Sequence, residues 1–555
     1  MAEIELPPKY YLTYYEEMLC FLEAKCPELL SEGEQYFIQS FRNLPEDARC
    51  LFLRMLNRRG RFFRIKKFSY PEIENIPAKL ELLLSQSFAL PLENTPPELS
   101  MEVFEVFSKA ELLAFPEVKA LDTKGIKQLK KPDLVSLLAE KTDITTLFPR
   151  LGKEELMVMQ GFEEETEMLR FLYFGNLYTD MTRFVVRDIG HVKFEYFDES
   201  QMSAYFGSRK EAEEKLALTK LYQYFREMRE EVEPEELYAE LDAWLLNLQE
   251  LTEPAQRVLD RLVLKMGRFF ERQTMPQQAL RIYQTTDKPP SRERQARLLH
   301  ATGETEAALK LCQTMMQDAN NADERYFAID FSNRIQKKKR LKSTTIFQKE
   351  ADKISIPISF QYQVEIGVLD YFYTQEKEGA WVENILWRGL FGMLFWDVIF
   401  KGDPETIHNP FQRGPSDLRK PEFFAKRESQ LHKQLKILDK PKRLKEYLDK
   451  TFEEKNGIMN PFVHWFDELP TLLDTLTSKV PADPLKKVML EIAHNPSEHT
   501  KGFPDLFVWD AAGYEFIEVK SPTDSLSPQQ LQWLEFFGEV GINAKVLNVE
   551  WLPEE

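Results

Sequence analysis

The sequence predicts a multidomain protein that is mainly α-helical in its amino-terminal two thirds and ends in an α/β domain. Three observations support this prediction. The chain has 555 residues, enough for three or four domains of ~150 residues each. Only 21 residues are glycine, and long stretches rich in Leu, Glu, Lys and Gln favour helices. After about residue 350 the pattern changes, and helical stretches alternate with short runs typical of strands.

Charge and cysteine content limit the classes of function. The chain carries 73 Lys and Arg against 91 Asp and Glu, a formal net charge of −18, so it lacks the overall basic character of a simple nucleic-acid-binding chain. Its four cysteines form no CxxC pair, which argues against a thiolate zinc finger and favours the reducing cytosol. The first residues do not resemble a signal peptide, and no apolar stretch is long enough for a bilayer. We therefore expect a cytoplasmic protein with no membrane partner.

The first predicted domain, residues 1–109, is helical from Tyr10 to about Leu83. Between Arg49 and Lys67 it holds eight basic residues and no acidic ones, interleaved with apolar ones. On helices this mixture turns an apolar stripe inward and several cations outward. An ordinary solvated face explains these cations as well as a surface that displaces counterions from phosphates does. The candidate DNA contacts in this domain are Arg58, Arg59, Arg61 and Arg64.

The second predicted domain, residues 110–207, contains a basic helical hairpin from Lys124 to Asp143. We expect a short helix, a turn at Lys131-Pro132 and a second helix capped from Asp133. The stretch resembles the helix-extended-helix of SAP-type DNA-binding motifs, although any short basic hairpin looks similar. A run typical of a strand follows at residues 183–196. The candidate DNA contacts in this domain are Lys127, Lys130 and Lys131.

The third predicted domain, residues 208–349, is a helical layer. Two similar pairs, Ala279-Leu280 and Ala308-Leu309, lie 29 residues apart. This spacing suggests stacked hairpins of a tetratricopeptide-like kind, whose usual repeat is ~34 residues. A helical layer without repeats explains the pattern equally well. The basic run at residues 337–342 marks the junction to the last domain, and we interpret it as a charged linker rather than a nuclear localisation signal.

The fourth predicted domain, residues 350–555, carries the candidate chemistry on a β-hairpin. Residues 506–509 and 515–519 are predicted strands, joined by turn residues. Side chains two apart on a strand point the same way, so Glu518 and Lys520 share a face. The hairpin brings Asp505 towards them. Hard carboxylate oxygens in such a group suit Mg²⁺ or Mn²⁺ together with a substrate phosphate.

The order of these residues is more specific than the Glu-x-Lys triplet, which alone fits a surface salt bridge. Pro504-Asp505, a strand, a turn and Glu518-Val519-Lys520 on a second strand are together similar to the PD-(D/E)xK nuclease constellation. A helix then begins with Ser527 as N-cap and Pro528 at its first position. Gln530 completes a capping box in our interpretation. The alternative is that its side chain reaches the active site.

Longer stretches resemble the Fanconi-associated nuclease family, whose carboxyl-terminal domain is called VRR-NUC. The sequences GFPDLFVW and EVKSPTDSLSPQQLQWL resemble that domain. WVENILWRGLFGMLFWDVIF looks like the family helix that offers an upstream glutamate, here Glu383, and NPFQRGPSDL looks like the family's insert. YYLTYYEEMLCFLE and RRGRFFRIKKFSYPEI look like the opening of bacterial members. The Cys and His spacing of the ubiquitin-binding zinc finger in larger animal members does not occur.

The resemblance implies roles for particular residues. Glu383, Asp505 and Glu518 would ligate Mg²⁺ or Mn²⁺ with the carbonyl of Val519, and Lys520 would be the catalytic lysine. An exposed carboxylate in the first turn of a helix is the other reading of Glu383. Basic residues near the motif are few: Lys501 is a candidate DNA contact, and Gln529 stands where some members have a lysine. Capture of a terminal 5′ phosphate therefore stays open.

The resemblance also implies a function. We expect a 5′ flap endonuclease and 5′–3′ exonuclease that acts on branched or flapped double-stranded DNA in interstrand-crosslink repair. We expect it to be a monomer and, as a bacterial-type member, to associate with the nucleoid. Two alternatives stay open at this point. One is a nuclease that resolves four-way junctions, and the other is a non-catalytic DNA-repair scaffold.

Overall fold

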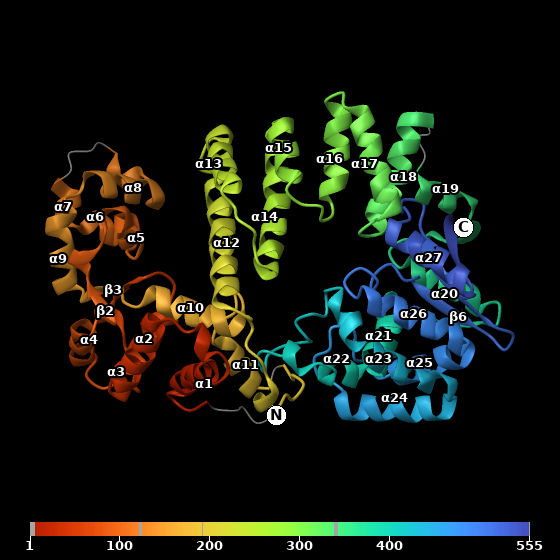
Figure 1. Cartoon of the computed structure of the whole chain (residues 1–555), viewed down its shortest axis with the longest axis horizontal. Helices are drawn as coiled ribbons and strands as arrows, with labels where there is room; N and C mark the ends of the chain where they lie inside the picture. The colour runs from red at the N-terminus through yellow and green to blue at the C-terminus, as the bar shows by residue number, and fades with distance from the viewer. Residues whose placement is uncertain (1–5, 121–124, 191, 338–341, 554–555) are drawn as a thin grey trace. The chain divides into compact units, whose positions relative to one another are not determined.

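The structure of the protein is a computed structural model that describes residues 6–120, 125–190, 192–337 and 342–553 (Figure 1). It divides into two compact units. One contains Met1–Gly190 and Ala204–Arg209, and the other His191–Ser203 and Lys210–Glu555. The predicted fold class, helical in the first two thirds with a carboxyl-terminal α/β domain, is confirmed. Within the described ranges no helix has both the length and the apolarity that a bilayer crossing requires.

The first unit begins with four helices that bury an aromatic core. Phe37, Phe41, Phe52 and Phe88 are all fully buried, and the rings of Phe52 and Phe88 meet edge to face at 5.1 Å. Such aromatic pairs stabilise a core beyond their buried area. The helices are α1 (Tyr10–Lys25), α2 (Glu32–Asn43), α3 (Glu46–Leu56) and α4 (Ile76–Ser85).

A small antiparallel sheet interrupts this helical region. Its middle strand, β3 (Met157–Gln160), lies between β1 (Phe62–Arg64) and β2 (Ala89–Pro91). β1 falls in a stretch that the sequence pattern predicted as helix. The alternation was hidden there because all three side chains of β1 are buried, which removes the polar and apolar contrast that marks a half-buried strand.

Five further helices of this unit enclose a second core. The SAP-like hairpin lies here, but its turn differs from the expectation. Lys131 and Pro132 already belong to the first turn of α8, where the missing N–H of proline costs nothing. Lys124, the first residue of the predicted hairpin, lies outside the described residues. The helices are α5 (Ser100–Glu105), α6 (Lys109–Ala114), α7 (Pro116–Ala120), α8 (Lys131–Lys141) and α9 (Ile144–Glu154).

The strand predicted at residues 183–196 is wrong. After α10 (Glu163–Phe174) the chain forms the helix α11 (Thr182–Asp188). Asp180 accepts a hydrogen bond from the amide of Thr182 at 2.9 Å, and the ring of Phe184 stacks on Tyr14 at 5.1 Å. These contacts override the strand preference of the β-branched residues in the run. Lys193 forms only an isolated bridge with Ile458.

The second unit starts with a series of helical hairpins, in which each helix from α14 to α18 packs against the next (Figure 1). The repeated alanines Ala279 and Ala308 are both fully buried. At Gly267 a Cβ atom would lie 2.6 Å from the ring of Tyr283, so glycine permits the close packing of α14 on α15. Of the junction at 337–342, residues 338–341 lie outside the described residues. The helices are α12 (Arg209–Met228), α13 (Pro234–Leu246), α14 (Glu253–Arg272), α15 (Pro276–Tyr283), α16 (Ser291–Ala301), α17 (Thr305–Gln317) and α18 (Ala322–Lys337).

The α/β domain is built on a five-stranded sheet of order β4-β8-β7-β6-β5. β8 runs parallel to β4 and β7, whereas β6 is antiparallel to β5 and β7. The predicted hairpin is therefore present, and Asp510 closes its turn by accepting hydrogen bonds from Ala512 and Gly513. The strands are β4 (Asp352–Pro357), β5 (Glu378–Trp381), β6 (Leu506–Trp509), β7 (Tyr514–Lys520) and β8 (Ala544–Leu552).

Helices cover both faces of this sheet. Leu506 and Ile517 belong to the core under α20, whereas Phe507 and Phe516 belong to the larger core with α21 and α27. The apolar run predicted as one helix is split at Phe395 into α21 and α22. The helices are α19 (Ser343–Glu350), α20 (Val364–Tyr373), α21 (Ile385–Leu394), α22 (Trp396–Lys401), α23 (Glu422–Leu435), α24 (Pro441–Lys455), α25 (Leu469–Lys479), α26 (Ala482–His494) and α27 (Pro528–Val540).

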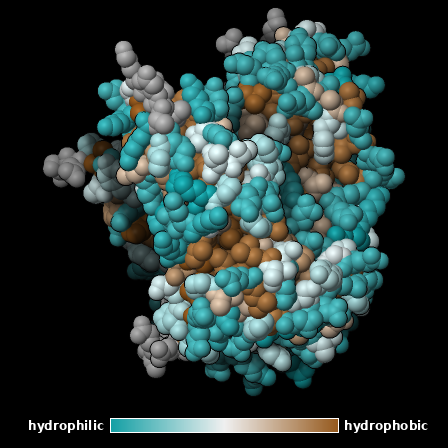
Figure 2. Space-filling view, turned by 90° about the vertical axis from the view of Figure 1, so that its left-hand side faces the viewer, coloured by the Kyte–Doolittle hydropathy of each residue, from teal (hydrophilic) through white to brown (hydrophobic). Residues whose placement is uncertain are grey.

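The surface reflects the composition. Hydrophilic side chains dominate the face drawn in Figure 2, and hydrophobic residues emerge between them in limited patches. This agrees with a chain in which 30% of the residues are charged.

Candidate active site

The alternation of side chains along β7 places Glu518 and Lys520 on one face of the sheet. Lys520 Nζ lies 2.6 Å from Glu518 Oε1. Glu518 is fully buried and Lys520 is 7% exposed. Burying a charged pair at this depth costs desolvation free energy, and the attraction between the two charges often does not offset that cost. The pair is therefore weak evidence for a purely structural role.

Asp505 joins this pair from the start of β6. Its Oδ2 accepts a hydrogen bond of 2.8 Å from the amide of Val519. Its backbone carbonyl accepts from the amides of Val382 and Glu383, at 2.8 and 3.2 Å. Asp505 therefore links β7 to the segment that precedes α21. The three residues that the sequence predicted to converge, Asp505, Glu518 and Lys520, do lie together.

Burial perturbs the acidity of both carboxyl groups. Desolvation raises the pKa of Asp505 to about 6, and the negative charges of Glu383 and Glu365 act in the same direction, against the Val519 amide and Lys520. Burial also raises the pKa of Glu518 well above its usual range, the charge of Asp505 adds to this, and Lys520 opposes it. Perturbed, clustered carboxyl groups of this kind are typical of functional sites.

Glu518 retains one oxygen that no neighbour satisfies. Its Oε1 receives Lys520, whereas Oε2 is buried and has no hydrogen-bond partner among the described residues. A buried carboxylate oxygen without a partner is costly, and a hard divalent cation satisfies it. The donors present therefore fit Mg²⁺ or Mn²⁺. In the side-chain arrangement seen here, the described part of the chain contains no group of three His, Cys, Asp or Glu ready to hold a metal ion.

Glu383 lies between β5 and α21, two residues before the helix begins, and it is exposed. It is therefore not the first-turn carboxylate that the alternative reading suggested. The adjacent Asn384 has a left-handed backbone, with φ of 54°. Its side chain donates to Glu383 Oε1 at 3.3 Å and accepts from the amide of Phe503 at 3.3 Å. Asn384 thus ties Glu383 to the loop that leads into Asp505.

Glu365 is not among the residues predicted from the sequence, and it lies in the first turn of α20. This helix packs on β6 and β7, and the charge of Glu365 raises the pKa of Asp505. An acidic residue in the first turn of a helix is common because it complements the helix dipole. No signal in a single sequence therefore separates Glu365 from the many glutamates that serve this stabilising role.

Gln530 fills both roles that the sequence left open. Its side-chain Oε1 accepts a hydrogen bond from the backbone N–H of Ser527 at 2.9 Å. Its backbone N–H donates to Ser527 Oγ at 3.2 Å, and the two bonds form the predicted capping box. Its Nε2 donates at the same time to Glu518 Oε1 at 2.6 Å. The side chain of a helix-capping residue thus reaches the buried carboxylate.

The predicted DNA contacts of the first unit differ in their availability. Arg58 and Arg59 are exposed, although Arg58 stacks on Phe68 at 4.2 Å and donates to Tyr70 Oη at 2.9 Å. Arg61 pairs with two glutamates, each at 3.1 Å. These arginines line a surface pocket of about 570 Å³. Their role in DNA binding stays a prediction.

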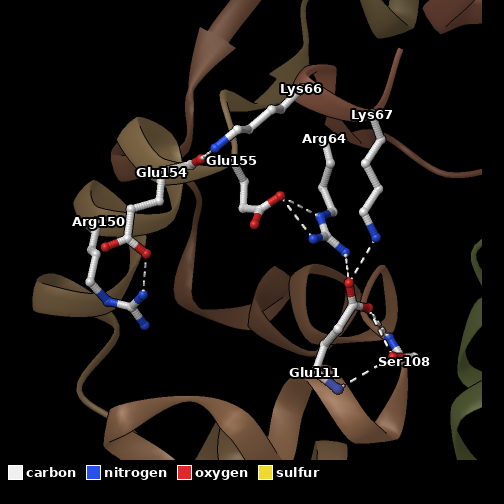
Figure 3. Close-up of polar contacts among 8 residues, drawn as sticks. All are labelled: Arg64, Lys66, Lys67, Ser108, Glu111, Arg150, Glu154 and Glu155. Atoms are coloured by element: carbon white, nitrogen blue, oxygen red, sulfur yellow. Dashed lines mark hydrogen bonds and ion pairs between the residues drawn. The ribbon is translucent and has the colours of Figure 1, made fainter. Parts of the chain in front are cut away.

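Arg64, another predicted DNA contact, is held by two glutamates (Figure 3). Its side chain is 7% exposed, and its guanidinium lies 2.8 Å from both Glu111 and Glu155. It also covers the ring of Phe107 at 4.3 Å. Burial and two carboxylate partners make Arg64 the least accessible of the predicted contacts, and its role in DNA binding stays a prediction. Arg64 joins β1 to α6 and to the residue that follows α9, and Lys67 lies 2.7 Å from the same Glu111.

The other predicted contacts are four lysines that differ in exposure. Lys127 and Lys130 are exposed, whereas Lys131 is half-buried and donates to the carbonyl of Glu105 at 2.8 Å. Lys501 is exposed, and its carbonyl accepts from Trp533 Nε1 at 3.0 Å. It lies four residues before Asp505. A role of these lysines on DNA stays a prediction.

Comparison with known proteins matches the chain over its whole length. Residues 9–89 match the family model described as the FAN1 HTH domain, and residues 439–551 match the VRR-NUC domain. A Fanconi-associated nuclease 1 homolog from Pseudomonas aeruginosa is 28% identical, over 98% of this chain and 96% of that protein. The homolog from Arabidopsis thaliana is 23% identical, over 99% of this chain and 68% of that protein. A crystal structure of paFAN1 bound to DNA with a 2-nucleotide 5′ flap and a gap is 26% identical, covers 100% of both chains and superposes with a TM-score of 0.81.

Proposed function

The chain belongs to the Fanconi-associated nuclease family, and from this premise we propose that it is a metal-dependent, structure-selective nuclease that hydrolyses DNA. The observation that carries the proposal is the buried group of Asp505, Glu518 and Lys520, in which one carboxylate oxygen of Glu518 has no partner among the described residues. This group combines hard ligands for a cation with a fixed positive charge. Both stabilise the negative charge that develops when a phosphodiester is cut.

The substrate that we propose is double-stranded DNA that carries a 5′ flap, cut endonucleolytically near the junction and then from 5′ to 3′. Solved structures of a related protein bound to 5′ flap DNA support this choice. We place this activity in the repair of interstrand crosslinks, at the bacterial nucleoid and in the form of a monomer. The recognition of branched DNA would rest on phosphate contacts, which read shape and orientation rather than sequence.

Four groups would hold the cation in this proposal: the carboxylates of Glu383, Asp505 and Glu518 and the carbonyl of Val519. When bound there, Mg²⁺ or Mn²⁺ neutralises charge on the phosphate and lowers the pKa of a water molecule. Asp505 and Glu518 must be ionised to bind it, so their raised pKa values make metal binding and proton release coupled events.

Lys520 acts on the reacting phosphate directly, and Gln530 acts on it through Glu518. Lys520 Nζ lies in a site from which water is largely excluded, where it stabilises the extra negative charge on the phosphoryl oxygens in the transition state. Gln530 holds Glu518 in one orientation through its 2.6 Å hydrogen bond. Because Lys520 and Gln530 share the same glutamate oxygen, a shift of Glu518 also moves the lysine.

The direct test is cleavage of a labelled 5′ flap by the purified protein with Mg²⁺, with Mn²⁺ and with a chelator. We expect cleavage with either cation, and loss of cleavage by more than about 100-fold in Asp505→Ala and Lys520→Ala. Cleavage that survives in these variants contradicts the assignment of the residues. Faster cleavage of a four-way junction than of a flap would favour a resolving nuclease, and DNA binding without any cut would favour a scaffold.

A further inference from the structure

The helix that carries Gln530 is attached to the last helix of the hairpin series. Tyr326 on α18 donates a hydrogen bond of 2.6 Å from its hydroxyl to Glu535 on α27. Tyr326 is 4% exposed. One turn earlier on the same helix, Asp323 accepts a hydrogen bond from the side chain of Gln529, the neighbour of Gln530. Two polar contacts thus fix the side of α27 that faces α18.

An apolar cluster supports these polar contacts. Tyr326 and Ala322 of α18 are buried together with Leu526, Leu531 and Leu534, which flank and form the first half of α27. A cluster of this kind resists sliding of one helix against the other because interiors are close-packed. The hydroxyl of Tyr326 is therefore held at one position relative to α27.

A second brace holds the loop that connects Lys520 to α27. Gln348 on α19 donates from Nε2 to the carbonyl of Asp524 and accepts at Oε1 from the amide of Leu526, each at 3.0 Å. Its own carbonyl accepts from Asn548 of β8 at 2.8 Å. One glutamine thus ties the loop after the catalytic strand to both α19 and the sheet.

The opposite side of α27 packs closely against the segment at Lys501 and Gly502. Gly502 has φ of 84° and lies so close that a Cβ atom there would be 2.8 Å from the backbone carbon of Gln529. Trp533 donates to the carbonyl of Lys501 at 3.0 Å. The first turn of α27 is therefore enclosed between the loop that leads into Asp505 and the helices α18 and α19.

We propose that Tyr326 and Gln348 are positioning residues, which set the orientation of Glu518 and Lys520 by holding Gln530 in place. The hairpin helices then contribute to the chemical step itself, in addition to any contact with DNA. The inference rests on the proposed nuclease function. Its physical basis is that a misplacement of ~1 Å in a catalytic group can lower a rate by ~100-fold.

The first variant is Tyr326→Phe, which removes the hydroxyl and keeps the ring in the apolar cluster. Its matched control is Tyr224→Phe, because Tyr224 makes the same contact, to Glu240 at 2.9 Å, between α12 and α13. We expect the single-turnover cleavage rate of a 5′ flap to fall by about 5- to 10-fold in Tyr326→Phe, with a dissociation constant for uncut flap within about twofold of wild type. The control should change neither quantity.

The second variant is Gln348→Leu, which removes both hydrogen bonds to the loop. Gln430→Leu is its control, since Gln430 on α23 donates a hydrogen bond of 3.0 Å to the carbonyl of Gly402.

Substitutions of Glu535, the partner of Tyr326, test the same contact from its other side. Glu535→Gln keeps an acceptor and should cut at nearly the wild-type rate, whereas Glu535→Leu should match Tyr326→Phe. Tyr326→Phe and Glu535→Leu each remove the same hydrogen bond. The double variant that combines them should therefore be no slower than either single variant.

The results separate this inference from the function on which it rests. A wild-type protein that does not cut any flap with Mg²⁺ or Mn²⁺ overturns both. A wild-type protein that cuts, with Tyr326→Phe and Gln348→Leu cutting as fast as their controls, overturns the inference alone. It is also overturned if rate, DNA affinity and thermal midpoint fall together, because that pattern indicates a contact that merely supports the fold.

Discussion

The side-chain amide of Gln530 donates a 2.6 Å hydrogen bond to the same oxygen of Glu518 that receives Lys520. Gln530 also caps α27 through its own carbonyl oxygen. One side chain therefore contributes both to the stability of α27 and to the orientation of Glu518, and different substitutions should separate the two effects.

Gln530→Glu should retain the cap and lose the catalytic contact. A glutamate at this position of a capping box is as good an acceptor as glutamine, so we expect an unchanged thermal midpoint. It turns a second carboxylate towards Glu518 where an amide stood, and we expect the single-turnover cleavage rate at neutral pH to fall by about 10- to 100-fold.

Ser527→Ala supplies the opposite case. It removes the hydroxyl that accepts from the amide of Gln530 at 3.2 Å, which should cost about 1 kcal/mol of stability. The contact to Glu518 stays, so the cleavage rate should remain within about twofold of wild type. Equal losses of activity in Gln530→Glu and Ser527→Ala would mean that capping alone explains the role of Gln530.

Divalent cations should stabilise the folded protein through the carboxylate group. At a cation concentration of about 100 times the dissociation constant, binding to the native state alone adds about 2.7 kcal/mol. Mg²⁺ or Mn²⁺ should therefore raise the thermal midpoint of the wild type and leave that of Asp505→Ala unchanged. Asp510→Ala is the control, since this carboxylate lies in the turn of the same hairpin. A shift that persists in Asp505→Ala would place the cation elsewhere.

The local part of the site could be predicted from the sequence. Asp505, Glu518 and Lys520 lie within 16 residues on one hairpin, and the strand period of two dictates which side chains share a face. The helix cap at Ser527 was predicted for the same reason, because an N-cap, a proline and a glutamine at fixed spacing form a local signal.

What the sequence could not reveal is set by packing between distant segments. Arg64 was assigned to DNA because its neighbours are basic, but its partners Glu111 and Glu155 lie 47 and 91 residues away. Tyr326 lies 209 residues from Glu535. Neither period nor composition of a single sequence encodes such pairings, since both depend on how the cores close around them.

Acid should weaken the first unit through Glu111 (Figure 3). Lys67, the amide of Ser108 and Arg64 hold the pKa of Glu111 well below its usual range. A carboxyl group with a depressed folded-state pKa contributes stability above its unfolded pKa, near pH 4.5, and loses it as the pH falls through the folded value. Glu111→Gln should therefore cost about 1–2 kcal/mol at pH 7 and less as the pH falls below about 4.

The measurement for Glu111 is urea unfolding at several pH values, with Glu154→Gln as control. Glu154 forms an i, i+4 pair with Arg150 and is 58% exposed, so its removal should cost no more than about 0.5 kcal/mol at any pH. A cost of Glu111→Gln that grows on acidification would reverse the sign of the linkage and refute the assignment.

Exposed arginines of the first unit should contribute to DNA affinity without affecting cleavage chemistry. Arg59 is exposed and lines the same surface pocket as Arg58 and Arg61. If it contacts a phosphate, Arg59→Ala should weaken binding uniformly across DNA sequences and reduce the slope of log K against log salt by about one.

Lys450→Ala is the control, because it removes an exposed cation that pairs with Glu454 on α24. This variant should keep the slope. The single-turnover rate at saturating protein should be the same in both variants, because neither Arg59 nor Lys450 belongs to the group formed by Asp505, Glu518 and Lys520. An unchanged salt slope in Arg59→Ala would remove this surface from the DNA-binding face.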